Sequence, residues 1–148
     1  MKLLIAAALA VMPMTAAPSA FAASAEVLRP RVPADQLKSV QSLKNPYTAS
    51  PEIIAQGKAL YSGKAFCQVC HGRDGKGLGA DVDTKSMKGA LPRDFTDRAW
   101  QRARTDGELM WILKHGSKDT AMPAFVPEIL TEQEAYLIIV YIRSLGGR

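Results

Sequence analysis

The sequence is poor in aromatic side chains and in the residues that usually build zinc sites. Aromatic residues make up 7% of the 148 positions, and the chain has two cysteines and two histidines. A structural zinc site usually takes four such ligands as two spaced pairs, but His115 lies far from the other candidates. A small domain with few aromatics has little core material, and a large planar cofactor would supply the missing apolar area.

The charge and the spacing of the glycines argue against a nucleic-acid-binding or a nucleotide-binding protein. The apolar fraction of 47% and the charged fraction of 22% are ordinary for a globular protein. The formal net charge of +5 is too small and scattered for a nucleic-acid surface, and no basic stripe with interleaved aromatics occurs. The glycines of residues 72–92 are irregularly spaced and follow no apolar strand, which argues against a phosphate-binding loop.

Residues 1–22 have the features of a cleaved export signal. A basic start is followed by the apolar run 3–12, and an A-x-A pattern predicts cleavage after Ala22, with Ala25 as the alternative. The other interpretation is a permanent anchor, but prolines break the run and it is shorter than a spanning helix requires. No later stretch reaches that length, so we expect a soluble protein that is exported, for example to the periplasm.

The rest of the chain divides into an arm, residues 23–50, and a domain, residues 51–148. Prolines interrupt the arm, and residues 34–44 could form one short helix; whether this arm wraps the domain or stays mobile is open at this stage. In the domain, capping boxes, apolar stripes and glycine stops predict helices, and no segment shows convincing strand alternation. The expected class is all-α. The predicted helices of the domain span residues 51–62, 96–103, 105–116 and 131–145.

Cys67-Gln68-Val69-Cys70-His71 is the most informative motif of the sequence. The spacing C-x-x-C-H is the attachment pattern of haem c. Two thiols three positions apart can each add to one vinyl group of the porphyrin, and the following histidine can bind the iron. The alternatives are a disulfide or redox dithiol, which would need a thioredoxin-like βαβ setting to be catalytic, and half of a zinc site.

The opposite face of the iron needs a second ligand or stays open. Met122 lies between two predicted helices in an Ala-Met-Pro-Ala-Phe segment, which the proline stiffens and the phenylalanine anchors. Such a segment can present a thioether across a haem plane, so Met122 is the predicted ligand. Met87 lies in a loop with nothing to direct it, Met110 falls in a helix where core packing is expected, and His115 falls at a helix end.

At these residues the sequence resembles the class I c-type cytochromes, specifically the small bacterial mono-haem cytochromes c. The resemblance covers roughly residues 51–147 and rests on CQVCH after the first helix, MPAF before the last helix and a terminal YIRSLG. It implies three to five helices around one covalently bound haem c. Cys67 and Cys70 would form the thioethers, and His71 and Met122 would be the axial iron ligands.

The resemblance also implies roles for residues around the haem. Gly57 and Tyr61 match the positions of the first helix that cross the terminal helix, with Tyr141 as the aromatic counterpart. Pro92 matches the proline whose carbonyl accepts a hydrogen bond from the ligand histidine and so fixes its orientation.

Three other side chains are candidates for contacts with the haem. Trp100 or Trp111 could pack near the haem edge or simply in the core. Arg93 could pair with a haem propionate or remain solvated.

The expected activity is one-electron transfer rather than catalysis, because filled axial positions leave no open site on the iron. The protein would be a carrier between a donor and an acceptor, or alternatively a dedicated haem subunit of a larger periplasmic or membrane-bound redox enzyme. A third alternative is an enzyme or gas sensor with a labile Met122. A mildly basic carrier suits partners with acidic docking surfaces, and contact with a membrane is expected only through redox complexes. Basic residues that could ring the haem edge, or simply be solvated, are Lys64, Arg73, Lys76 and Lys118.

Overall fold

The computed structural model describes residues 27–78, 83–85 and 87–147, and in this part of the chain the regular elements are helices without any strand. The predicted signal peptide and its cleavage points, Ala22 and Ala25, lie outside the described residues. The all-α class is confirmed. None of the helices within these ranges is long and apolar enough to cross a membrane. The helices are α2 (Ala34–Ser42), α3 (Pro51–Ser62), α4 (Gln68–His71), α5 (Arg98–Ala103), α6 (Asp106–His115) and α7 (Glu132–Leu145).

The local signals at the helix ends account for the boundaries. The Ser50 hydroxyl accepts a hydrogen bond from the Ile53 N–H at 3.3 Å and caps α3. Thr105 and Thr131 each form a complete capping box, with the glutamate three positions on, at the start of α6 and α7. These reciprocal bonds satisfy backbone N–H groups that the first turn of a helix otherwise leaves unpaired. The predicted starts of all three helices are therefore confirmed.

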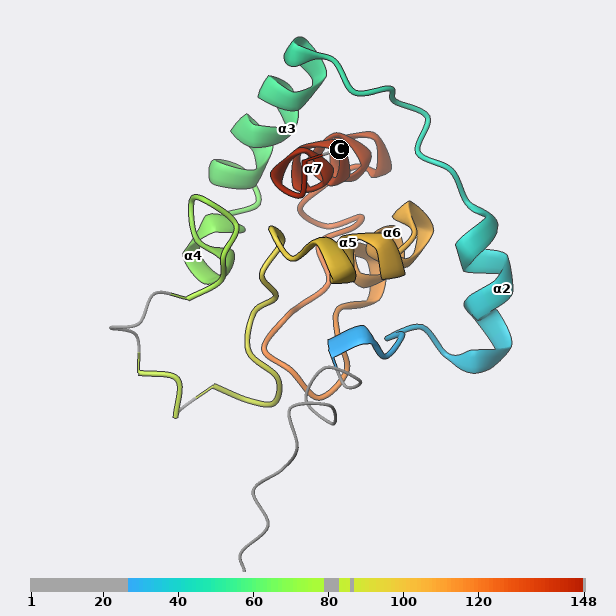
Figure 1. Cartoon of the computed structure of the whole chain (residues 1–148), viewed down its shortest axis with the longest axis vertical. Coiled ribbons are helices and arrows are strands. Elements are labelled where there is room, and N and C mark those ends of the chain that lie inside the picture. Colours follow the sequence, from blue (N-terminus) through green and yellow to red (C-terminus); the bar gives the residue numbers. More distant parts are fainter. Residues whose placement is uncertain (1–26, 79–82, 86, 148) are drawn as a thin grey trace, which may run out of the picture.

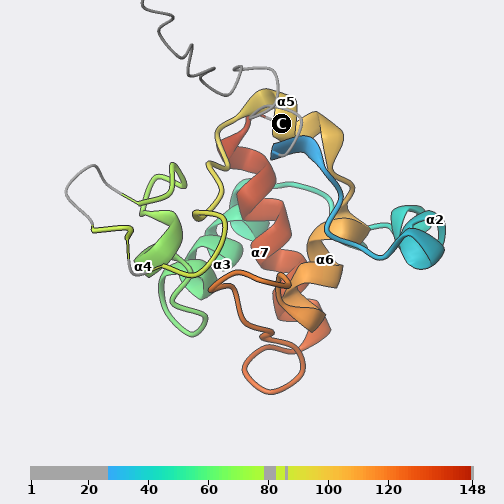
Figure 2. The same cartoon turned by 90° about the horizontal axis from the view of Figure 1, so that it is seen from below.

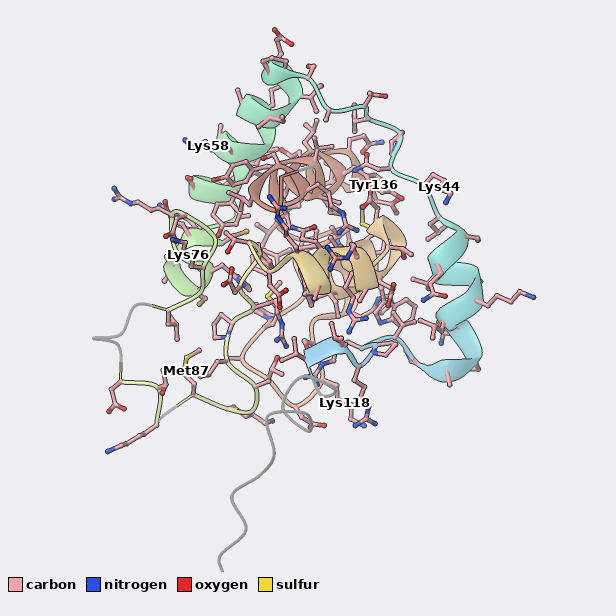
Figure 3. The ribbon with its side chains drawn as sticks, viewed as in Figure 1. Lys44, Lys58, Lys76, Met87, Lys118 and Tyr136 are labelled. Atoms are coloured by element: carbon pink, nitrogen blue, oxygen red, sulfur yellow. The ribbon has the colours of Figure 1, made fainter. Side chains whose placement is uncertain are left out.

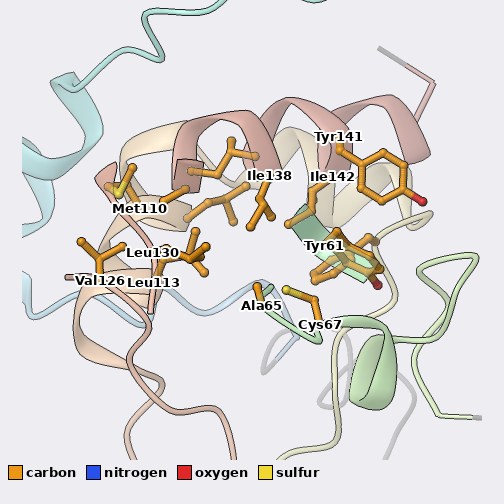
Figure 4. Packing of buried hydrophobic residues seen from close by; sticks show 14 of the residues in the cluster. Tyr61, Ala65, Cys67, Met110, Leu113, Val126, Leu130, Ile138, Tyr141 and Ile142 are labelled. Carbon is orange, nitrogen blue, oxygen red and sulfur yellow. The ribbon is translucent and has the colours of Figure 1, made fainter. Parts of the chain in front are cut away.

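Among the described helices, the most extensive contact is the crossing of α3 and α7 (Figure 1). Gly57 allows the close approach, because a Cβ at this position would meet the Leu137 carbonyl oxygen and lie 2.9 Å from the Tyr141 Cβ. The rings of Tyr61 and Tyr141 pack edge to face beside this point, with centroids 5.1 Å apart (Figure 4). The predicted crossing, with its glycine and two tyrosines, is confirmed.

A polar network holds α5 against α6 and α7. The Gln101 side chain is 1% exposed and donates hydrogen bonds to the carbonyl oxygens of Phe95 and Ile142, both at 2.8 Å. Arg143 donates to the Gln101 carbonyl oxygen at 2.9 Å and to the Asp106 carboxylate at 2.7 Å. Because every contact joins separate elements, this network orders the short helix α5, which could not be stable alone.

The arm is packed on the domain, which resolves the question that the sequence left open. The helix α2 lies against α6 (Figure 2), where Gly107 leaves room for the Val40 carbonyl group. The side chain of Asn45 donates a hydrogen bond to the Tyr136 carbonyl oxygen at 3.0 Å. Of the apolar face expected for residues 34–44, Val40 is buried and Leu43 is exposed.

Candidate functional site

A largely apolar cavity of about 190 Å³ lies beside α4 and α6 and contains the four residues singled out by the sequence. Its walls come from α4, the segment 87–95, the helices α5 and α6, the segment 117–125 and the start of the arm. Residues far apart in the sequence thus share one enclosure. The chemistry-bearing residues on its walls are Cys67, Cys70, His71, Met87, Met122, Arg29, Arg31, Arg93, Arg104 and Glu108.

The two cysteines lie on one helical turn, because Cys67 is the N-cap residue of the short helix α4 and Cys70 lies within it; the sequence did not predict this helix. Both thiols are free, with Cys67 buried and Cys70 exposed, so the alternative of a disulfide is not formed. Burial raises the pKa of the Cys67 thiol to about 11. Figure 4 shows Cys67 at the margin of the hydrophobic core, next to Ala65. The turn therefore offers two free thiols from one side of the cavity.

The orientation of His71 is fixed by two contacts. Its Nδ1 lies 3.1 Å from the Arg93 carbonyl oxygen, and because a carbonyl can only accept, Nδ1 carries the proton. The ring stacks on Phe95 with centroids 4.3 Å apart and planes 18° apart. Burial lowers the pKa of His71, which favours the neutral imidazole that binds metals. Nε2 is left as the nitrogen available for an iron.

The acceptor for His71 differs from the expectation by one residue. Pro92 was predicted to provide the carbonyl, but the hydrogen bond runs to Arg93 instead. The Pro92 carbonyl turns toward Gly77, where a Cβ would approach it to 3.0 Å, and Pro92 itself lines the cavity. Successive carbonyls of an extended chain point to opposite sides, so a shift of one residue exchanges the acceptor.

The segment that carries Met122 is held by backbone hydrogen bonds rather than by a helix. The Met122 N–H donates to the Thr120 hydroxyl at 3.1 Å, and the Ser117 N–H donates to the Met122 carbonyl oxygen at 3.0 Å. Gly116 adopts a φ of +72°, and a Cβ there would come within 2.8 Å of that same carbonyl. The Phe125 N–H donates to the Leu113 carbonyl oxygen at 2.7 Å and ties the segment to α6.

The other candidates for the second iron ligand differ in whether they line the cavity. Met110 is 1% exposed and lies in the hydrophobic core, as expected. His115 is exposed and stacks on Trp111 with centroids 3.7 Å apart, and neither residue lines the cavity. Met87 does line it, from the loop that Figure 3 shows on the periphery of the molecule. Two methionines therefore face this enclosure, and Met87 has to be tested alongside Met122.

The two tryptophans considered for packing near the haem lie in different places, and one of them lines the cavity. Trp100 lines the cavity and also packs against Phe95, with ring centroids 5.5 Å apart. Trp111 belongs to the stacked pair outside it.

The charged residues on the described walls are four arginines and Glu108, and most of them were missed by sequence reasoning. Arg93 lines the cavity as expected, and Arg29, Arg31 and Arg104 join it. The basic residues proposed to ring the haem edge do not line the cavity, and two of them, Lys64 and Lys76, pair with Glu134 and Asp74 respectively. The missed arginines lie in the arm and at the junction of α5 and α6, where no local motif marks them.

The donor set fits a covalently attached haem. Two thiols and an imidazole come from one turn, a thioether comes from another wall, and the remaining surface is largely apolar, as a porphyrin requires. In the described part of the chain no three or more His, Cys, Asp or Glu side chains come together as a metal cluster. A site of the zinc type is therefore not formed among these residues.

The family model for cytochrome c matches residues 54–146. The chain belongs to the cytochrome c family. It is an electron-transfer haem protein, and its cofactor is covalently bound haem c. The match begins just after the arm, so residues 27–50 are an addition to the part of the chain that the family describes.

Two known proteins are similar to this cytochrome c. It is 30% identical over 112 residues to the cbb3-type cytochrome c oxidase subunit CcoP of Helicobacter pylori, covering 74% of this chain and 32% of that protein. A chain in the structure of the Kuenenia stuttgartiensis reducing HAO-like protein complex is 26% identical, with a TM-score of 0.55, covering 68% of this chain and 46% of that one. This chain thus spans about a third of the curated relative and less than half of the structural one.

Proposed function

We propose that this cytochrome c is a one-electron carrier whose haem is attached through Cys67 and Cys70 and whose iron is bound by His71 and Met122. The supporting observation is that these four side chains, brought together from two distant segments, line a single apolar cavity. Bound haem c supplies the electron-transfer chemistry, because its iron changes between the ferric and ferrous states.

The protein's own residues hold this site in one arrangement. The hydrogen bond from His71 to the Arg93 carbonyl and the stacking on Phe95 fix the imidazole ring and raise its strength as a ligand. The bonds around Thr120 and Ser117 fix the backbone of Met122. Apolar walls exclude water, so little reorganisation accompanies the gain or loss of an electron.

Exchange of electrons with partners would occur near Cys70, where the described surface is apolar. The side chains of Phe66 and Val69, which directly precede Cys67 and Cys70 in the sequence, are 66% and 69% exposed. Redox donors and acceptors would approach the protein at this surface. The haem edge near the thioethers would be the point of transfer.

The ligand set is tested with Met122→Ala and the matched control Met87→Ala. Loss of Met122 is expected to lower the reduction potential, since methionine–histidine ligation raises it, and to let the reduced protein bind carbon monoxide. The wild type and Met87→Ala should not bind carbon monoxide at neutral pH. Carbon monoxide binding by Met87→Ala, with Met122→Ala unaffected, would assign the iron to Met87 instead.

A second function in the same class is that of a dedicated haem subunit of a larger redox enzyme. It is favoured by the names of both relatives, one an oxidase subunit and the other a member of a protein complex, and by the partial coverage of each. Size-exclusion chromatography of the protein from its native source separates the two functions. A stable partner that co-elutes would support the subunit, and elution as a single small species would support the carrier.

A further inference from the structure

The start of the arm forms part of the cavity wall, although it lies outside residues 54–146, which the cytochrome c family matches. Val27 and Val32 of the arm line the cavity, as does Leu109 of α6. In Figures 1 and 2 the first described residues of the arm lie beside α5 and α6, with α4 further away. The arm therefore adds apolar surface to the cavity at a distance from the turn that carries the cysteines.

The burial of Val32 is not explained by packing in the main hydrophobic core. Val32 is 6% exposed, but it does not belong to the cluster of buried residues that the structure describes around Tyr61 and Ile138. Val40, further along the arm, is also 6% exposed and outside this cluster, yet it is not among the described residues that line the cavity. Two identical side chains of one arm are thus equally buried, and one of them faces the cavity.

Two buried charged residues hold the arm in this place. The Arg104 guanidinium donates hydrogen bonds to the carbonyl oxygens of Arg29, at 2.5 Å, and of Val27, at 3.5 Å. Arg104 also pairs with Glu108 at 3.6 Å, and the Glu108 carboxylate accepts a hydrogen bond from Gln41 of α2 at 3.5 Å. Because both charged side chains are shielded from water, solvent competes little with these contacts. The arm is therefore fixed to the cavity wall at two points.

An apolar wall changes the chemistry of a haem by excluding water. Ferric haem carries one positive charge more at its centre than ferrous haem, so a polar surrounding favours the ferric form. The apolar shell around such a site and its exposure to solvent therefore help to set the reduction potential. A haem held between His71 and Met122 occupies the cavity that Val27 and Val32 line.

We propose that the start of the arm, residues 27–32, is part of the haem-binding site, where Val27 and Val32 cover the haem and keep water from it. This inference rests on the haem placement of the proposed function. It extends the haem site of this chain beyond the residues that the family matches. By excluding water, the arm favours the ferrous form and raises the reduction potential.

The test compares Val32→Thr with the matched control Val40→Thr in the full-length holoprotein. Threonine has nearly the shape of valine but adds a hydroxyl, so it is not a neutral replacement in an apolar place. Each variant puts the same polar group at an equally buried position of the same arm, and only the first position lines the cavity. Reduction potentials are measured by spectroelectrochemistry.

Val32→Thr should shift the ferric-to-ferrous ratio toward the ferric form by roughly threefold at a fixed potential, a fall of about 28 mV for a one-electron couple. Val40→Thr should leave the potential unchanged. Equal potentials in Val32→Thr and the wild type, or equal shifts in both threonine variants, would overturn the inference.

A second measurement uses the wild-type holoprotein and needs no substitution. In NMR spectra of the reduced protein, the methyl protons of Val32 should show nuclear Overhauser contacts with protons of the porphyrin. The methyl protons of Val40 should show none. The inference fails if Val27 and Val32 both lack these contacts.

Carbon monoxide binding keeps this result separate from the proposed ligands. If the wild type excludes carbon monoxide but the arm makes no contact with the porphyrin, only the inference about the arm is lost. If the wild type binds carbon monoxide, the proposed Met122 ligand is lost. The contacts of Val32, recorded in the carbon monoxide complex, then still decide on the arm.

Discussion

The wall of the cavity that carries His71 and the wall that carries Met122 are built in different ways. His71 follows the cysteines on a helical turn that is continuous with the core, and a ring and a carbonyl fix its orientation. Met122 lies on a segment without regular structure, held by a few hydrogen bonds to a hydroxyl and to neighbouring backbone. We therefore expect substitutions in the wall that carries His71 to change haem attachment and stability. Substitutions in the wall that carries Met122 should change mainly the binding of ligands to the iron.

The largest effect is expected where the first wall meets the haem. The double change Cys67→Ala/Cys70→Ala removes both thiols and should abolish covalent attachment, whereas each single change should leave one thioether. Haem staining after denaturing electrophoresis measures this. Haem that stays with the double variant under these conditions would show that other residues attach it.

The change Gly57→Ala should disturb the crossing of α3 and α7, which supports the wall that carries His71. Alanine alone would favour a helix by about 1 kcal/mol over glycine, but its Cβ would meet the Leu137 backbone and the Tyr141 side chain. Overpacking of this kind usually costs about 1–3 kcal/mol, so the free energy of unfolding should fall. Denaturant titration of the holoprotein checks the sign, and a gain in stability would mean that α3 and α7 do not cross this closely.

The second wall is loosened by Thr120→Val, which keeps the shape but removes the hydroxyl that accepts the Met122 N–H. A lost hydrogen bond of this type is worth about 1 kcal/mol, so an added ligand such as imidazole should displace Met122 roughly fivefold more readily. The global stability should change little. Ser39→Ala, which removes a hydroxyl on α2 far from the cavity, is the control, and equal ligand binding by both variants would contradict the role of Thr120.

The smallest effect is expected at the surface between α3 and α7. Lys64→Gln removes the ion pair with Glu134, whose atoms are 2.8 Å apart and join an exposed lysine to a half-buried glutamate, and should cost about 0.2–1 kcal/mol. The hydrogen bond from Lys64 lowers the pKa of Glu134 below the usual value of a glutamate. The contribution is therefore complete above about pH 4.5 and is lost as the pH falls through the lowered pKa. Denaturant titrations at pH 7 and pH 3 should show a smaller difference between variant and wild type at pH 3.

Local signals were sufficient for most of the helices but not for the finer contacts around His71. Capping residues and glycine stops act within a few positions of the chain, so the starts of α3, α6 and α7 could be read directly. The carbonyl partner of His71 depends on how the segment 92–95 crosses the cavity, and this produced the exchange of Pro92 for Arg93. No local rule determines which of two adjacent carbonyls faces a distant ring.

By itself, the sequence determined the haem-attachment motif and the helical class, because both depend on spacings of a few residues. It also predicted Met122 as the second iron ligand, with His115 as the rival. Only the tertiary structure decided that Met122 and Met87 face the cavity, that His115 does not, and that the arm closes the cavity with Val27 and Val32. The reason is physical: burial and charge in a cavity come from packing between distant segments, such as the arm against α5 and α6, and no short stretch of sequence encodes them.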